Sequence, residues 1–200
     1  MSRMSIGADY LDQVRRALRG HKRLAEGAIA QLQDKELFYQ PDSESNSVAV
    51  MMKHIAGNMR SRFTDFLTTD GEKPDRHRDQ EFEISAHTTR AQLTEMWESG
   101  WKIVSDAVAS LKEDDLERTI TIRGEVLTVL QALHRAVAHY AYHVGQVVFL
   151  AKHIRGAEWK SLSIPRGQSE QVNAAMAARK PTAGVPERSK QEDLERTKFP

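Results

Sequence analysis

The sequence predicts an all-α protein whose core is a four-helix bundle. Apolar residues recur every three or four positions in four long segments, and the connections between them are short or polar. Only one short stretch alternates as a β-strand does, and it is too small to form the core of a sheet. A chain of 200 residues fits one bundle domain over residues 1–168, followed by an extension over 169–200 that is partly helical or disordered.

The first two predicted helices are amphipathic segments of different regularity. Residues 10–32 carry an apolar stripe that slips near Gly20, so this segment is either one helix or a broken pair. A loop containing proline, serine and aspartate follows, and Asn46 or Ser47 can cap the next helix. The second predicted helix covers residues 48–67, where large apolar residues form a clean stripe.

The third and fourth predicted helices lie on either side of a predicted hairpin. The third begins at Thr89, because Thr89 and Gln92 match the capping-box pattern. Residues 119–126 alternate around an Arg-Gly pair, which predicts a short hairpin. The fourth helix, residues 127–154, is apolar on most of its faces, which predicts burial in the middle of the fold. Gly156 suits its C-terminal cap.

Several segments show no strong periodicity. Residues 68–83 form a long polar stretch, and loops of this length are often functional or mobile. The charged run at 72–79 is most simply a solvated loop, and the alternative is a rim that selects a charged substrate. Near the C-terminus, residues 159–165 are predicted to be extended and 170–180 to form a short helix, whereas the last twenty residues are predicted to be disordered.

Composition excludes several classes of function. The 29 basic and 28 acidic side chains give a net charge of +1, which offers no basic surface for nucleic acid. The absence of cysteine excludes disulfides, thiolate metal sites and a cysteine nucleophile. No apolar stretch reaches the roughly 20 residues that span a bilayer, and the N-terminus does not resemble a secretory signal, so we expect a cytoplasmic protein without membrane contact. The chain has no Walker A loop, no dinucleotide fingerprint and no Glu-x-x-His pair of a di-iron site.

Three histidines in the predicted helices have a spacing that suits a metal site. His139 and His143 are four residues apart, so they lie on one helix face about 5–6 Å apart at Cβ. His54 lies in the second predicted helix, which can face the fourth in a bundle. Imidazole is the commonest protein ligand of zinc, nickel and related metals. Three histidines leave a coordination position open, as catalytic metal sites do.

The alternative interpretation is that these histidines are core residues. A neutral interior imidazole can be satisfied by hydrogen bonds to backbone or side chains, and an unsatisfied one costs about 1–3 kcal/mol. The spacing is compatible with both interpretations. Gln146, one turn beyond His143, is a candidate hydrogen-bond partner that would fix the tautomer of an imidazole.

The other five histidines are predicted to lie away from this site. His134 and His153 fall on different faces of the fourth predicted helix. His21, His77 and His87 lie in polar contexts and are predicted to be solvated.

Two segments resemble the metal motifs of a known superfamily. Residues 48–58, VAVMMKHIAGN, and residues 139–146, HYAYHVGQ, resemble those of the DinB/YfiT-like metalloenzymes. Residues 66–74, 78–82 and 159–165 resemble a branch of that superfamily described as being of unknown function. The order and placement of these motifs are more specific than any one of them, and together they cover roughly residues 5–170.

This resemblance implies a fold, a metal and a class of reaction. It implies an up-down-down-up four-helix bundle, often dimeric, with zinc or nickel on His54, His139 and His143. Characterised relatives include thiol-dependent S-transferases and a mycothiol-dependent isomerase, so a low-molecular-weight thiol is an expected substrate.

Hydrolysis by metal-activated water is a second hypothesis. A non-catalytic metal-binding or stress-response protein is a third, and a bundle that has lost its metal and binds partners is a fourth.

Overall fold

The computed structural model describes residues 5–178, which are mostly helical. The described residues form two compact units, up to Gly156 and from Ala157 onward. The predicted disorder of the last twenty residues lies outside the described part of the chain. The elements are α1 (Ile6–Ile29), η1 (Asp34–Phe38), α2 (Val48–Phe63), η2 (Arg78–Phe82), α3 (Arg90–Ser110), η3 (Glu113–Glu117), β1 (Thr119–Ile122), β2 (Glu125–Thr128), α4 (Val129–Arg155), η4 (Gly156–Glu158) and α5 (Ser169–Ala178), where η marks a 3-10 helix.

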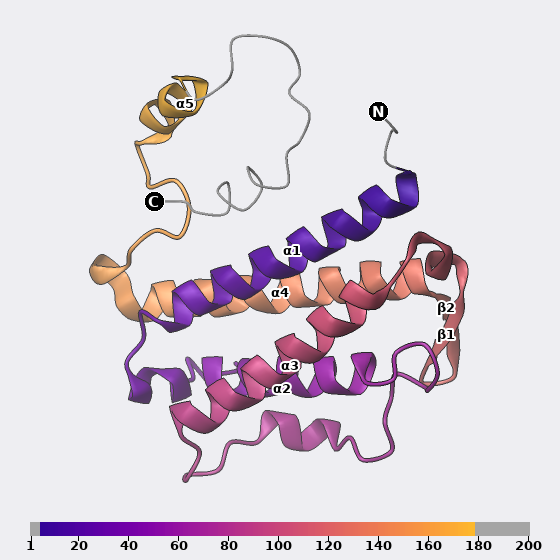
Figure 1. Cartoon of the computed structure of the whole chain (residues 1–200). Helices are drawn as coiled ribbons and strands as arrows, with labels where there is room; N and C mark the ends of the chain where they lie inside the picture. The colour runs from indigo at the N-terminus through magenta and orange to yellow at the C-terminus, as the bar shows by residue number, and fades with distance from the viewer. Residues whose placement is uncertain (1–4, 179–200) are drawn as a thin grey trace. The chain divides into compact units, whose positions relative to one another are not determined.

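The first unit is built from two helix pairs. Helix α1 packs along α4, and α2 packs along α3, with further contacts between α2 and α4 that join the pairs (Figure 1). Large aromatic side chains fill the space between the helices. Trp97 and Trp101 of α3 have ring centroids 5.6 Å apart, and Trp101 lies 5.9 Å from Tyr140 of α4. All three are buried. Aromatic burial of this size contributes a large part of the stability of a small domain.

Helix α1 is one continuous helix and not a broken pair. Its predicted stripe slips near Gly20 because the buried face is continued by small residues, Ala25 and Ala28, which are fully buried. Alanine at these positions lets the neighbouring helix approach closely. Small buried residues therefore continue the apolar stripe of α1 where large apolar residues are absent.

Helix α2 begins where the sequence predicts and ends earlier. Ser47 is its N-cap, and the Ser47 hydroxyl accepts a hydrogen bond from the amide of Val50. The helix ends at Phe63, four residues before the predicted end at 67, because Asp65 adopts a left-handed conformation with φ of 48°. Phe66 remains buried after this turn, which explains why the apolar periodicity continues past the helix.

The predicted hairpin is present as an antiparallel pair, with Thr119 opposite Thr128. Its turn is Arg123-Gly124, and both residues have positive φ, 56° and 74°. This is the conformation that two-residue hairpin turns require. Helix α4 starts at Val129, two residues later than predicted, because Thr128 caps it in a capping box.

Helix α4 is exposed along part of its circumference, so the prediction that it is buried in the middle of the fold is wrong. Leu130, Tyr142 and Phe149 have exposed fractions of 42%, 63% and 74%. Helix α4 packs along α1 and touches α2, and these two neighbours cover only part of its circumference. Among the described residues, no helix is both long and apolar enough to cross a membrane.

The second unit contains little regular structure. Helix α5 confirms the short helix predicted over 170–180. Residues 159–165 form neither helix nor strand.

Candidate metal centre

Helices α2 and α4 bring the three predicted histidines together. One nitrogen from each of His54, His139 and His143 lies within 4.8 Å of the others. The Nε2 atoms of His139 and His143 are 3.0 Å apart. The ring centroid of His54 is 5.5 Å from that of His139 and 4.9 Å from that of His143. A histidine of one helix therefore faces a pair of histidines on the other.

The geometry and chemistry of this cluster fit a divalent metal ion. Nitrogen ligands about 2.0–2.1 Å from a tetrahedral zinc stand about 3.3 Å apart, close to the separation of His139 and His143. An all-imidazole donor set suits zinc, nickel, copper or iron. Within the described part of the chain, no acidic side chain completes the group, so three protein ligands would leave a coordination position open.

Glu81 fixes the orientation of His54. Its Oε2 atom is 2.8 Å from His54 Nδ1, and both side chains are buried. A carboxylate at this distance holds the imidazole proton on Nδ1 and leaves the Nε2 lone pair free. Burial alone would raise the pKa of Glu81, but hydrogen bonds from His54 and Arg76 lower it below its ordinary value. Glu81 is therefore an anion at neutral pH.

Arg76 holds Glu81 in turn. Its Nε donates to Glu81 Oε1 at 2.8 Å, and its second terminal nitrogen donates to Oε2 at 2.9 Å. The exposed fractions of the two side chains are 5% and 9%. Such a two-point ion pair fixes both side chains and satisfies both carboxylate oxygens. The prediction of a solvated loop over 72–79 is therefore wrong for Arg76.

Gln146 fixes the orientation of His143, as Glu81 does for His54. Its Oε1 atom lies 2.8 Å from His143 Nδ1, as the sequence suggested. An amide oxygen accepts, so His143 carries its proton on Nδ1 and presents Nε2 to His139. Two of the three histidines thus have their tautomers set by a neighbour, and the free Nε2 of His143 faces His139.

Glu81 and Arg76 are the residues that sequence reasoning missed. Glu81 is 27 residues from His54 and lies in η2, inside the stretch predicted as a polar loop. The one available signal was the placement of Gly57 one turn after His54. A Cβ on Gly57 would overlap the Glu81 carboxylate, so only glycine leaves room for it.

The remaining histidines lie elsewhere. His134 and His153 are exposed on α4. His77 lines a different cavity, on the α3 side of α2. His21 corrects the prediction of a solvated side chain: within the described residues its Nδ1 is buried without a partner, and burial lowers its pKa.

A cavity opens onto the cluster. It has a volume of about 240 Å³ and is lined by His54 and His139 together with side chains of α2, α4, η2 and the hairpin. This volume is slightly below that of drug-sized sites and suits a small molecule. His54 and His139 can therefore be reached by a substrate.

His139 stays neutral at physiological pH, and this gives a testable pH dependence. Burial, followed by the positive charges near it, lowers the pKa of His139 from 6.5 to about 4. Between these pKa values the unfolded chain binds more protons than the folded one. The free energy of unfolding therefore rises with pH through this window, and the contribution of His139 reaches its full value above about pH 6.5. We expect the urea concentration at the unfolding midpoint of the metal-free protein to decrease as the pH is lowered from about 6.5 to about 4. The decrease should be smaller in His139→Gln. An equal fall in both proteins would show that His139 does not contribute.

A comparison with protein-family models identifies the family of this chain. It belongs to the family described as "Protein of unknown function (DUF1572)", whose model matches residues 5–168. A search of curated proteins found no match.

Proposed function

We propose that His54, His139 and His143 hold a divalent metal ion, zinc or nickel, and that the protein is an enzyme that activates a low-molecular-weight thiol or water there. The observation that carries the proposal is the convergence of three imidazoles, two of which have their proton positions set by side chains outside the cluster. Core histidines need only hydrogen-bond partners. A set of three imidazole nitrogens within 4.8 Å of one another, with a cavity beside it, suits a metal with an open position.

The chain's own residues prepare the site for this chemistry. Glu81 and Gln146 hold the Nδ1 protons of their histidines. The ring of Phe82 lies 4.8 Å from that of His54 and covers one of its faces. A divalent ion bound there would supply Lewis acidity, which lowers the pKa of a thiol or water in the open position. A thiol is the preferred substrate because of the resemblance to the DinB/YfiT-like enzymes, and metal-dependent hydrolysis is the alternative.

The same resemblance supports a finer proposal about the arrangement of the helices. The pairing of α1 with α4 and of α2 with α3 suits an up-down-down-up four-helix bundle of that superfamily. A homodimer and a cytoplasmic location remain predictions from the sequence. A non-catalytic metal-binding or stress-response protein would share the cluster and would lack turnover of any thiol or electrophile.

Metal content distinguishes a metal site from core histidines. We expect protein purified without a metal-binding tag to carry about one zinc or nickel ion per chain and His139→Ala/His143→Ala to carry almost none. The matched control is His134→Ala/His153→Ala, which removes two exposed histidines from the same helix and should keep the metal. Elemental analysis measures the content, and circular dichroism shows whether both variants remain helical.

The outcomes separate the hypotheses. Wild-type protein without metal, and without uptake when zinc or nickel is added, would overturn the proposal. Equal loss of metal from both double variants would show that the ion is not held at the cluster. Metal at the cluster without turnover of any thiol or water-dependent substrate would favour the non-catalytic alternative.

A further inference from the structure

The cavity beside the histidine cluster is lined by arginine. Five arginine side chains face it, and no aspartate or glutamate is among its lining residues. They come from α2, the loop after it, η2, the hairpin turn and α4: Arg62, Arg76, Arg78, Arg123 and Arg135. Five separate segments of the first unit thus contribute a guanidinium group to the one small cavity that His54 and His139 also line.

Three of these arginines have structural partners, and one of the three, Arg123, is exposed and donates to Glu72 at 2.8 Å. Arg76 is held by Glu81, and Arg62 donates to Glu72 at 2.9 Å. Both side chains are largely buried, with exposed fractions of 5% and 12%. Breaking either pair would leave a buried charge without compensation. These two arginines are held by their carboxylate partners and are not free to move onto a ligand.

Two others are free to change partners. Arg78 is 3.6 Å from the exposed Asp79, and Arg135 is 2.9 Å from the exposed Glu125. Exposed pairs of this kind contribute about 0–1 kcal/mol, so a ligand can replace them at little cost. Arg78 also stacks 4.9 Å over the ring of Phe82, which itself packs against His54.

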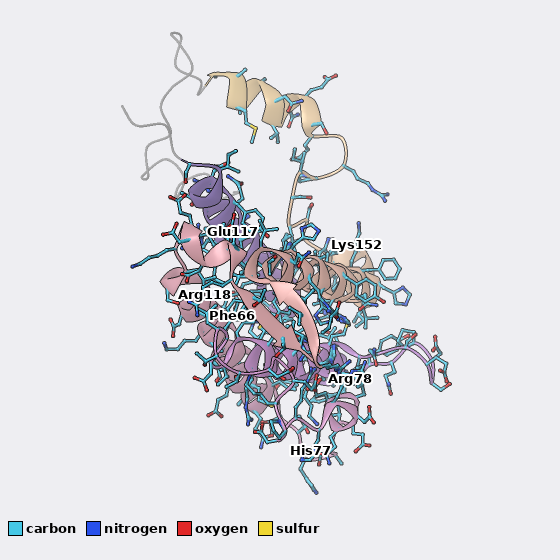
Figure 2. All side chains as sticks on the ribbon, turned by 90° about the vertical axis from the view of Figure 1, so that its right-hand side faces the viewer. Phe66, His77, Arg78, Glu117, Arg118 and Lys152 are labelled. Atoms are coloured by element: carbon cyan, nitrogen blue, oxygen red, sulfur yellow. The ribbon has the colours of Figure 1, made fainter. Side chains whose placement is uncertain are left out.

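The view onto the hairpin end of the first unit shows how these groups are placed. Phe66 and Arg78, which both line the cavity, appear on opposite sides of the hairpin (Figure 2). The apolar part of the lining comes from Phe63, Phe66, Ile122, Ala132 and Ala136. An apolar wall with a few directed cations suits a small organic anion better than a neutral or cationic molecule.

We propose that the substrate of this site is a small organic anion, whose carboxylate or phosphate is bound by Arg78 and Arg135 while its reacting group faces the histidine cluster. This inference rests on the proposed function for the reacting group, but the anion site rests on the arginines alone. The volume of about 240 Å³ limits the ligand to a small acid, since it equals roughly eight water molecules at about 30 Å³ each.

The test compares two three-carbon thiols, one ending in a carboxylate and the other in an uncharged alcohol. Cobalt-substituted protein is titrated with 3-mercaptopropionate and with 3-mercaptopropan-1-ol, and the visible spectrum of the ion reports binding of each. We expect the wild type to bind the carboxylate about tenfold or more tightly than the alcohol. In R78Q/R135Q this preference should fall to within about threefold, with affinity for the alcohol unchanged.

A matched control removes an arginine from outside the cavity. Arg60 lies on α2, the same helix as His54, and pairs with the exposed Asp75. R60Q removes a charge of the same kind and should keep the full preference for the carboxylate. Equal affinity of the wild type for both thiols would overturn the proposal. A preference that survives in R78Q/R135Q would also overturn it, because the carboxylate would then be binding the metal itself.

A second titration separates failure of the anion site from failure of the proposed function. Malonate carries no thiol, and its binding to metal-free protein is followed by calorimetry. We expect binding to the wild type that is about tenfold weaker in R78Q/R135Q. If neither thiol alters the cobalt spectrum but malonate binds in this way, thiol activation fails and the anion site stands. No binding of malonate to the wild type would overturn the anion site, whatever the metal does.

Discussion

Replacing Glu81 by alanine is expected to weaken metal binding about 10–100-fold and to lower the free energy of unfolding of the metal-free protein by about 3–5 kcal/mol. The loss of affinity follows because His54 loses the acceptor that holds its proton on Nδ1. The loss of stability follows because Arg76, with an exposed fraction of 5%, loses a two-point partner and keeps only a longer contact with Glu72 at 3.4 Å. Zinc competition titrations measure the first effect and urea denaturation the second.

Two further variants make this prediction specific. Asp75→Ala removes an acidic group from the same segment, but its partner Arg60 is exposed, so we expect a cost of about 0–1 kcal/mol and unchanged metal affinity. Glu81→Gln keeps an oxygen for His54 and removes the charge opposite Arg76. It should therefore retain more metal affinity than stability. If Glu81→Ala were no more harmful than Asp75→Ala, Glu81 would have no role in orienting the cluster.

The helices and the hairpin could be predicted because their signals are local. Ser47 and the pair Thr89 and Gln92 satisfy backbone donors at the first turns of α2 and α3, and these contacts span three residues. The Arg123-Gly124 turn needs positive φ, which glycine adopts without cost. Interactions within a few residues can be found from one sequence without knowledge of the fold.

The boundaries and faces of the helices depend on distant contacts and were predicted less well. Helix α2 ends before Phe66, although Phe66 is buried, because a buried residue after a turn continues the apolar pattern as well as a helical one does. Helix α4 looks apolar all round, yet Tyr142 and Phe149 are exposed. Which face of a helix is covered depends on its neighbours, and the sequence of one helix does not contain that information.

The candidate site also contains residues that local spacing predicts and residues that depend on distant contacts. His139 and His143 are neighbours by helical spacing, so their pairing needs no tertiary information. Their encounter with His54 needed the expectation of two facing helices. Glu81 could not be predicted from residue spacing, because its approach to His54 depends on the path of a long irregular segment. That path is set by contacts such as the Asp70 carboxylate accepting from the backbone amides of Arg123 and Gly124.

Replacing Gly57 by alanine is expected to destabilise the protein by about 1–3 kcal/mol and to weaken metal binding, although alanine is the better helix former. A Cβ on Gly57 would lie 2.8 Å from Cδ of Glu81 and closer still to Oε1. A flexible carboxylate would normally move aside, but this one is held by Arg76 and His54. Making room for the methyl group therefore stretches or breaks the hydrogen bonds that orient the cluster.

Gly145 provides the matched control for this prediction. It is also a glycine within a helix of the first unit, but a Cβ there would meet nothing within 4 Å. Gly145→Ala should therefore stabilise the protein by about 0.5–1 kcal/mol and leave metal affinity unchanged. The two substitutions are chemically identical and have opposite expected signs, so urea denaturation of both separates helix propensity from crowding at Glu81. If both variants were stabilised, the Glu81 carboxylate would not be held against α2 in solution.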